Sequence, residues 1–224
     1  MSKLFCLTFI LCCFVSIFAQ EKTIGKDEFD AMYNNALAKR ASKSYRITIT
    51  FQNSVEGKSE KPNSGTVVIE FAPPSMRRIV YQSNSEPQDK KRETIRINDK
   101  IYTKEGAANW KEVNPNNQQP ANKSNVVESK TEYKFLGSEM LDNQKTNVYE
   151  KIEDRKRVNP ADNKEIISNA VTKYWFGEDG ELLKVEQAVE LHIGGELLHN
   201  RLTKIYKFDP NIKIEAPQIT NLEK

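Results

Sequence analysis

From Tyr45 onward, apolar and polar residues alternate with a period of two, and this alternation limits the fold more than any other feature of the chain. Such a period predicts β-strands with one apolar face and one polar face. The first run places Tyr45, Ile47, Ile49 and Phe51 on one face. The next run, residues 65–71, does the same with Val67, Ile69 and Phe71, and it ends at a proline pair that cannot donate to a strand ladder.

One helix is predicted before this region, over residues 26–42. It places Phe29, Tyr33, Ala36 and Leu37 at helical spacing among charged residues, as in a half-buried amphipathic helix. Further short strands are predicted over residues 76–82, 93–98, 100–104, 110–113, 133–140 and 146–152. Polar stretches predict loops over residues 53–64, 83–92, 114–125 and 154–164.

Two turn signals set the register of the last third of the chain. Asp179-Gly180 and Gly194-Gly195 are typical of two-residue hairpin turns. The first predicts that Phe176 lies opposite Leu183 and Tyr174 opposite Val185; the second predicts that Leu191 lies opposite Leu198. Leu202 continues on that face, so one face of three strands is predicted to be nearly all apolar, and the other to face solvent.

The width of such a sheet predicts its curvature. Ten strands at about 4.8 Å span roughly 48 Å, whereas one helix is about 10 Å across and covers about two strands. The sheet must therefore curl around its apolar face. We predict one α+β domain over residues 20–224, with the amphipathic helix packed on a strongly curled, mostly antiparallel half-barrel of about ten strands.

The N-terminal segment predicts export. Residues 4–19 form an apolar run after Lys3, too short at about 24 Å to span a bilayer and typical of a signal peptide cleaved after Ala19. Its removal would take away all three cysteines. Leu11 before Cys12 is not the small residue that a lipoprotein signal needs. We therefore expect an exported, periplasmic protein that is not a lipoprotein.

The order of several motifs resembles that of the periplasmic lipoprotein carriers of the LolA type and their mycobacterial LppX-like relatives. The matching elements are Gly65 to Pro73-Pro74, residues 77–81, residues 95–102, residues 176–184 and residues 206–217. The resemblance implies a half-barrel of about eleven strands whose concave apolar face holds acyl chains under a helical lid. Where such carriers have lid helices, residues 114–125 are polar and have no apolar stripe, so the resemblance does not extend to a lid-gated hand-off.

Candidate ligand contacts follow from the predicted apolar face. The interior candidates are Tyr45, Ile47, Ile49, Phe51, Val67, Ile69, Phe71, Tyr174, Phe176, Leu183, Val185, Leu191, Leu198 and Leu202. Arg77 and Arg78 are candidates for a headgroup or lid contact. Alternation must turn one of the two towards the apolar face, where an unpaired charge would need a partner.

No motif in the chain predicts catalysis. Glu190, His192 and His199 share one face of the last hairpin, but a solvated face explains them better than a metal site. We expect no catalytic residues, no metal and no cofactor. The near balance of 34 basic and 31 acidic side chains, a formal charge of +3, gives no reason to expect nucleic-acid binding.

The leading hypothesis is an exported, non-enzymatic carrier for a lipid or an acylated protein, held on the concave apolar face of the sheet. Its short basic clusters leave open a transient contact with a membrane surface or with envelope proteins, and we expect a monomer. The alternative is an exported structural or sensory β-domain with a filled core that binds protein partners. A continuous apolar cavity under the helix would favour the carrier.

Overall fold

The computed structural model describes residues 21–58, 62–87, 90–114, 125–159 and 163–219. The predicted signal peptide and most of the polar segment 114–125 lie outside these residues. The helix is α1 (Lys26–Ala41). The strands are β1 (Lys22–Thr23), β2 (Tyr45–Val55), β3 (Asn63–Ala72), β4 (Met76–Ser83), β5 (Arg92–Ile97), β6 (Lys100–Glu105), β7 (Lys111–Val113), β8 (Asn125–Leu141), β9 (Gln144–Val158), β10 (Glu165–Gly177), β11 (Leu182–Ile193) and β12 (Glu196–Phe208).

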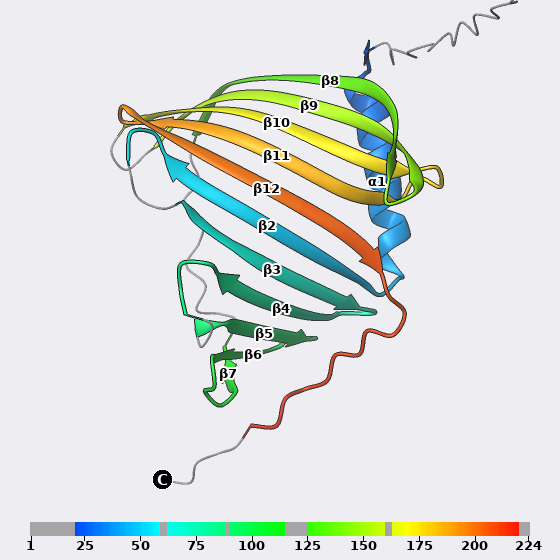
Figure 1. Ribbon diagram of the computed structural model, residues 1–224, viewed down its shortest axis with the longest axis vertical. Coiled ribbons are helices and arrows are strands. Elements are labelled where there is room, and N and C mark those ends of the chain that lie inside the picture. Colours follow the sequence, from blue (N-terminus) through cyan, green and yellow to red (C-terminus); the bar gives the residue numbers. More distant parts are fainter. Residues whose placement is uncertain (1–20, 59–61, 88–89, 115–124, 160–162, 220–224) are drawn as a thin grey trace, which may run out of the picture.

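The twelve strands form a single sheet in the order β1-β8-β9-β10-β11-β12-β2-β3-β4-β5-β6-β7. Two antiparallel meanders, β2 to β7 and β8 to β12, are joined where the last strand pairs with β2, from Leu198 opposite Val55 to Phe208 opposite Tyr45. The edge strands β1 and β7 do not meet, so the sheet is an open half-barrel (Figure 1). The α+β class is therefore as predicted, with twelve strands in place of about ten.

The helix crosses the strands near one of their ends instead of lying along two of them (Figure 1). Phe29 packs on Tyr133 of β8, with ring centroids 4.9 Å apart, and the Arg40 guanidinium lies 4.6 Å from the ring centroid of Tyr206 in β12 and 5.5 Å from that of Tyr45 in β2. Five strand spacings separate β8 from β2, about 24 Å along the sheet, whereas the helix rises only about 16.5 Å from Phe29 to Arg40. The sheet therefore curves towards the helix, and the helix side is concave.

The buried face of the helix differs from the predicted one at its last turn. Phe29 and Ala36 are buried as expected, but Leu37 is 38% exposed and Arg40 is 8% exposed. Arg40 occupies the position one turn after Ala36 because its guanidinium stacks on the two tyrosine rings while its stem packs on apolar surface. Beneath the helix, the interior is filled by the rings of Phe29, Tyr133 and Tyr174 and by the core around Phe176 and Leu182.

The turn signals set most of the register correctly. Gly194 and Gly195 both have positive φ, and Leu191 lies opposite Leu198. Tyr174 lies opposite Val185, but a bulge between Trp175 and Phe176 places Leu182 opposite Phe176, so the predicted partner Leu183 is wrong by one residue. The predicted loop at residues 154–164 is also wrong in its first part, because β9 continues to Val158.

The alternation predicts a uniformly polar convex face, but the structure also buries apolar side chains there. Ile95 and Tyr102, on the convex face of β5 and β6, are 7% and 6% exposed. They form a second core cluster with Ala72 and with Ile214 from the segment that follows β12. This segment runs back beside the ends of β3 to β5 (Figure 1), so it covers convex apolar side chains that the sheet alone leaves exposed.

Trp175 also lies on the convex face, and its side chain is buried. It is 5% exposed. Its indole N–H donates to a carboxylate oxygen of Glu139, and the Lys184 ammonium lies 4.5 Å from the ring centroid. The indole N–H therefore has the polar partner that a buried tryptophan usually finds, and the cation above the ring adds a favourable contact.

We predict that Leu182→Ala lowers the free energy of unfolding by about 2–5 kcal/mol, because Leu182 is 1% exposed and its truncation leaves a cavity. Leu198→Ala is the matched control, since Leu198 is only half-buried, and its loss should be well below that of Leu182→Ala. Urea unfolding of both variants measures the difference. Equal losses would contradict the placement of the core under the helix.

Candidate functional site

The concave face carries an open apolar patch beside the helix. We use this name for seven half-buried side chains, which are Ile49, Phe51, Val67, Ile69, Ile79, Tyr81 and Leu202. Cross-strand pairing brings them together, since Ile69 lies opposite Ile79, Val67 opposite both Ile49 and Tyr81, and Leu202 opposite Phe51. Ile79 and Tyr81 are not among the predicted interior residues, although alternation from Arg77 places both on this face.

Gly65 allows an aromatic ring to lie flat at the far end of the apolar patch. A Cβ on Gly65 would lie 2.7 Å from Cζ of Phe51 and 2.5 Å from the carbonyl oxygen of Gln82, closer than real Cβ contacts. The Phe51 ring lies beside this glycine and stacks on Tyr81, with centroids 6.0 Å apart. Apolar side chains therefore line the concave face of β2 from Tyr45 to Phe51, a distance of about 20 Å at 3.4 Å per residue.

Beyond the apolar patch, polar side chains interrupt the concave face of β9 to β11. The Lys151 ammonium lies 3.3 Å from a carboxylate oxygen of Glu153, which also accepts a hydrogen bond from Arg155. In the neighbouring strands, the Gln187 amide donates to the Thr172 hydroxyl at 3.2 Å. The expected, nearly all-apolar face of β10 to β12 is therefore interrupted, and these polar groups separate the apolar patch from the apolar pair Leu191 and Leu198.

The predicted ligand contacts fall into two groups. Ile47, Phe176 and Val185 are buried core residues, 9%, 2% and 7% exposed, and Tyr174 packs edge-on against Phe29. Burial raises the pKa of the Tyr174 phenol to about 12, so it stays neutral. The others, which are Tyr45, Ile49, Phe51, Val67, Ile69, Phe71, Leu183, Leu191, Leu198 and Leu202, remain half-buried.

The two candidate arginines of β4 lie on opposite faces. Arg77 lies in a concave row with Phe71 on one side and Arg96 on the other. This row borders a pocket of about 610 Å³ at the rim of the sheet, which we call the rim pocket; Tyr45 and Lys43 also line it. Arg78 lies on the convex face, where it is paired with carboxylates. The structure therefore separates two neighbours in the sequence into two different environments.

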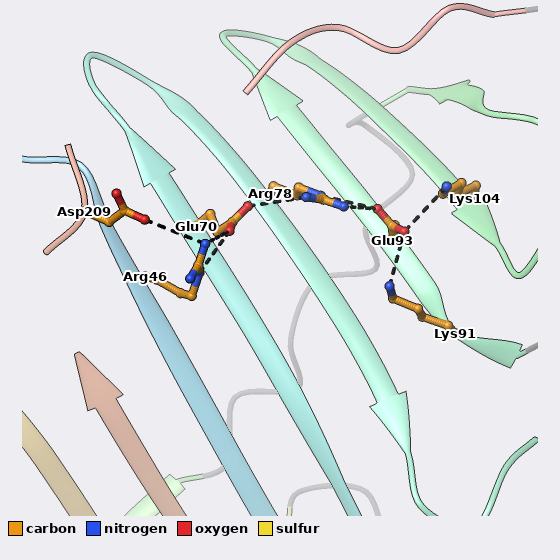
Figure 2. A network of polar contacts seen from close by, with 7 residues as sticks. All are labelled: Arg46, Glu70, Arg78, Lys91, Glu93, Lys104 and Asp209. Carbon is orange, nitrogen blue, oxygen red and sulfur yellow. Dashed lines mark hydrogen bonds and ion pairs between the residues drawn. The ribbon is translucent and has the colours of Figure 1, made fainter. Parts of the chain in front are cut away.

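Arg78 belongs to a network of alternating charges that crosses five strands on the convex face (Figure 2). Its guanidinium lies 2.9 Å from Glu93 of β5 and 3.5 Å from Glu70 of β3. Glu70 also pairs with Arg46 of β2 at 2.8 Å. Lys91, Lys104 and Asp209 complete the network, with Lys91 and Lys104 beside Glu93 and Asp209 beside Arg46.

Glu93 is the most buried member of this network, at 7% exposure. Burial raises the pKa of its carboxyl, but the hydrogen bond from Arg78 and the positive charges of Arg78, Lys104 and Lys91 outweigh burial, so the pKa lies below its ordinary value. The hydrogen bond to Glu93 likewise raises the pKa of Arg78. Glu93 and Arg78 are thus both ionised at neutral pH, and the network links β2 to β6.

Of the remaining candidates, Glu190 and His199 lie close to each other. Nδ1 of His199 lies 3.6 Å from a Glu190 oxygen. Within the described ranges, no group of three His, Cys, Asp or Glu side chains could hold a metal ion. In the same part of the chain, no helix has the length and apolar character needed to cross a membrane.

We predict that Glu93→Gln lowers the free energy of unfolding at pH 7 by about 1.5–3 kcal/mol, because it leaves the Arg78 charge without its nearest carboxylate. Because the pKa of Glu93 is lower in the folded state, its carboxylate stabilises the fold at pH values above the ordinary carboxyl pKa of 4.5. This stabilisation disappears as the pH falls through the pKa of the folded state. The difference between wild type and variant should therefore shrink in acid. Denaturant unfolding across this pH range measures it.

The exposed pair Lys156 and Glu165 provides the control for this experiment. Glu165→Gln removes a carboxylate 2.6 Å from an ammonium, but both side chains are at least 40% exposed. Its effect should stay below about 1 kcal/mol at every pH. Equal effects of the two substitutions would contradict a stabilising role for the buried network.

No family model matches the chain, and no curated protein matches its sequence. Solved structures that are similar to it include the following three. A LolA superfamily protein from Nitrosomonas europaea has 7% identity and a TM-score of 0.31, with 79% of this chain and 92% of that chain covered. An outer membrane lipoprotein-sorting protein domain from Vibrio parahaemolyticus has 12% identity and a TM-score of 0.33, with 82% and 93% covered. A DUF1329 family protein from Desulfovibrio piger has 11% identity and a TM-score of 0.30, with 84% and 94% covered.

Proposed function

We propose that this protein is an exported, non-enzymatic carrier that binds the acyl chain of a lipid or of an acylated protein on the apolar patch. The observation that carries the proposal is the patch itself, a contiguous set of seven half-buried apolar side chains on a concave face that the helix covers at only one end. Contiguous apolar surface on a soluble domain is typical of a binding site. Polar side chains such as Gln187 and Thr172 border the patch on the side of β10 and β11.

Burial of hydrocarbon would supply the affinity. Each enclosed methylene contributes about 0.8 kcal/mol, so about ten of them correspond to roughly 8 kcal/mol, the free energy of a micromolar complex. The concave curvature allows side chains of several strands to contact one chain. Because the space under the helix is filled by aromatic rings, the ligand would lie beside the helix and not beneath it.

A second candidate function is protein binding at a sheet edge. Among the described strands, the two-residue β1 alone pairs with the outer side of β8, and Val126 and Val127 near the start of β8 are 56% and 62% exposed. An exposed edge of this kind can accept a strand from a partner. This is the structural or sensory β-domain of the sequence analysis, and the experiment below separates it from the carrier.

We predict that lipid co-purifies with the native protein in near-stoichiometric amount and that Ile49→Asp loses it by at least tenfold, because a carboxylate on the apolar patch must be desolvated by the ligand. Organic extraction and mass spectrometry measure the bound lipid. Fluorescence of N-phenyl-1-naphthylamine, an apolar probe, reports the empty site.

Thr50→Asp is the matched control, because it places the same charge one residue later in β2, on the exposed convex side. It should retain lipid and probe. Val67→Asp repeats the test away from the core under the helix in case Ile49→Asp unfolds; circular dichroism monitors folding. A clean extract together with no probe fluorescence in wild type would contradict the carrier and favour the protein-binding β-domain.

We also predict export with cleavage after Ala19, so that intact-mass spectrometry of the protein from the periplasmic fraction of a Gram-negative host gives a chain that begins at Gln20. A charged residue in the apolar run, Phe9→Asp, should block this processing because a signal peptide needs an uninterrupted apolar segment. A cytoplasmic protein with an intact N-terminus would contradict export.

A further inference from the structure

Two arginines lie directly opposite each other at the rim pocket. In the register of β4 and β5, Arg77 is paired with Arg96, and both face the concave side next to Phe71 and Tyr45. Like charges directly opposite each other on a sheet are destabilising. Two guanidinium groups placed together at the rim therefore favour an anion beside them.

The chain does not supply that charge. On these strands, Arg46 and Arg78 pair with glutamates, and Arg92 lies 3.3 Å from Glu86 and 3.9 Å from Glu105. In contrast, among the described residues no carboxylate oxygen lies within 4.0 Å of Arg77 or Arg96. Among the described arginines of β2 to β7, ion pairing is thus the rule, and the two exceptions are neighbours facing one pocket.

The polar groups around the rim pocket do not neutralise the arginines. Nε of Arg96 donates to the carbonyl oxygen of Asn98 at 3.2 Å, which supplies no negative charge. Asp99 lines the pocket at the hairpin turn without an ion pair to either arginine. Lys43, a further cation of the lining, is paired with Glu181. The pocket therefore carries an excess of positive charge.

Arg40 adds a third guanidinium behind the pocket. It is 8% exposed, and its guanidinium carbon lies 5.5 Å from the ring centroid of Tyr45, which lines the rim pocket. Its partners are the rings of Tyr45 and Tyr206, and within the described part of the chain it has no carboxylate partner. A buried cation behind an aromatic wall strengthens the positive potential in front of that wall.

We propose that Arg77 and Arg96 bind the anionic headgroup, a phosphate or a carboxylate, of an amphiphile whose chain lies on the apolar patch. This inference rests on the proposed function and deepens it. Guanidinium groups match such oxyanions because their planar N–H donors can form two parallel hydrogen bonds. Along β3 and β4, the next residues on the same face are Ile69 and Ile79, about 7 Å from the arginine row, so the chain of a ligand held at the rim would continue onto the patch.

Isothermal titration with dodecyl phosphate, dodecyl maltoside and inorganic phosphate, each below any micelle concentration, tests this assignment. In wild type we expect dodecyl phosphate to bind at least tenfold more tightly than dodecyl maltoside, and inorganic phosphate to bind far more weakly than either. Arg77→Gln and Arg77→Gln/Arg96→Gln should remove the preference for dodecyl phosphate and leave the affinity for dodecyl maltoside unchanged.

Arg92→Gln is the matched control, because it removes one positive charge from the same face of the same strand pair but from an arginine that already has carboxylate partners. It should keep the preference. Thermal unfolding of Arg77→Gln should show a midpoint no lower than that of wild type, since the substitution relieves a like-charge contact.

The outcomes separate the two proposals. Equal affinity for both amphiphiles in wild type overturns the headgroup site and leaves the carrier standing, whereas no binding of either amphiphile overturns both. If inorganic phosphate binds as tightly as dodecyl phosphate, and Ile49→Asp does not weaken either ligand, the pocket is a site for a free anion. This result would overturn the assignment of an amphiphile as the ligand. If Arg77→Gln lowers the unfolding midpoint and weakens the binding of both amphiphiles equally, the role of Arg77 is structural. This result would also overturn the assignment.

Discussion

The pairing of β12 with β2 is the contact on which the rest of the structure depends. It joins the end of the chain to its first long strand, and without it the two meanders would be separate sheets. Arg40 lies at this junction, over one tyrosine from each strand. The apolar patch is also built across it, since Leu202 of β12 lies opposite Phe51 of β2. The curvature, the helix position and the candidate site are therefore consequences of one long-range strand pair.

The two faces of the strands around β2 are stabilised by different interactions. On the convex side, charges of alternating sign satisfy each other across neighbouring strands, and the C-terminal segment buries the apolar side chains beside them. Over the apolar patch, the described residues form neither a charge network nor a covering segment, and Lys204, opposite Ile49, is a cation at its border. Since the convex interactions hold the strands in register, the concave surface can stay open without being needed as the main core. Because the two faces have these separate roles, the folded domain can keep an apolar area of ligand size exposed to solvent.

Local patterns in the sequence predict the local part of this fold. The helix, the strand alternation and the hairpin at Gly194-Gly195 follow from periodicity and turn chemistry, and most interior candidates lie on the concave face. The pairing of β12 with β2 has no local signal, because no turn connects the two strands. The bulge beside Phe176 and the burial of Trp175 depend on how the sheet bends. Arg40 could not be identified as buried, since periodicity treats arginine as a surface residue.

The network of Figure 2 also affects what the protein presents to its surroundings. Its seven side chains carry four positive and three negative charges in alternation, so their fields largely cancel at a distance. Arg77 and Arg96 lie on the concave face of the same strands and have no carboxylate partner among the described residues, so their electric field is not cancelled in this way. A dissolved anion approaching this sheet would thus be drawn towards one side of it. Added salt would slow that capture, because at 0.1 M ionic strength the attraction is screened beyond about 10 Å.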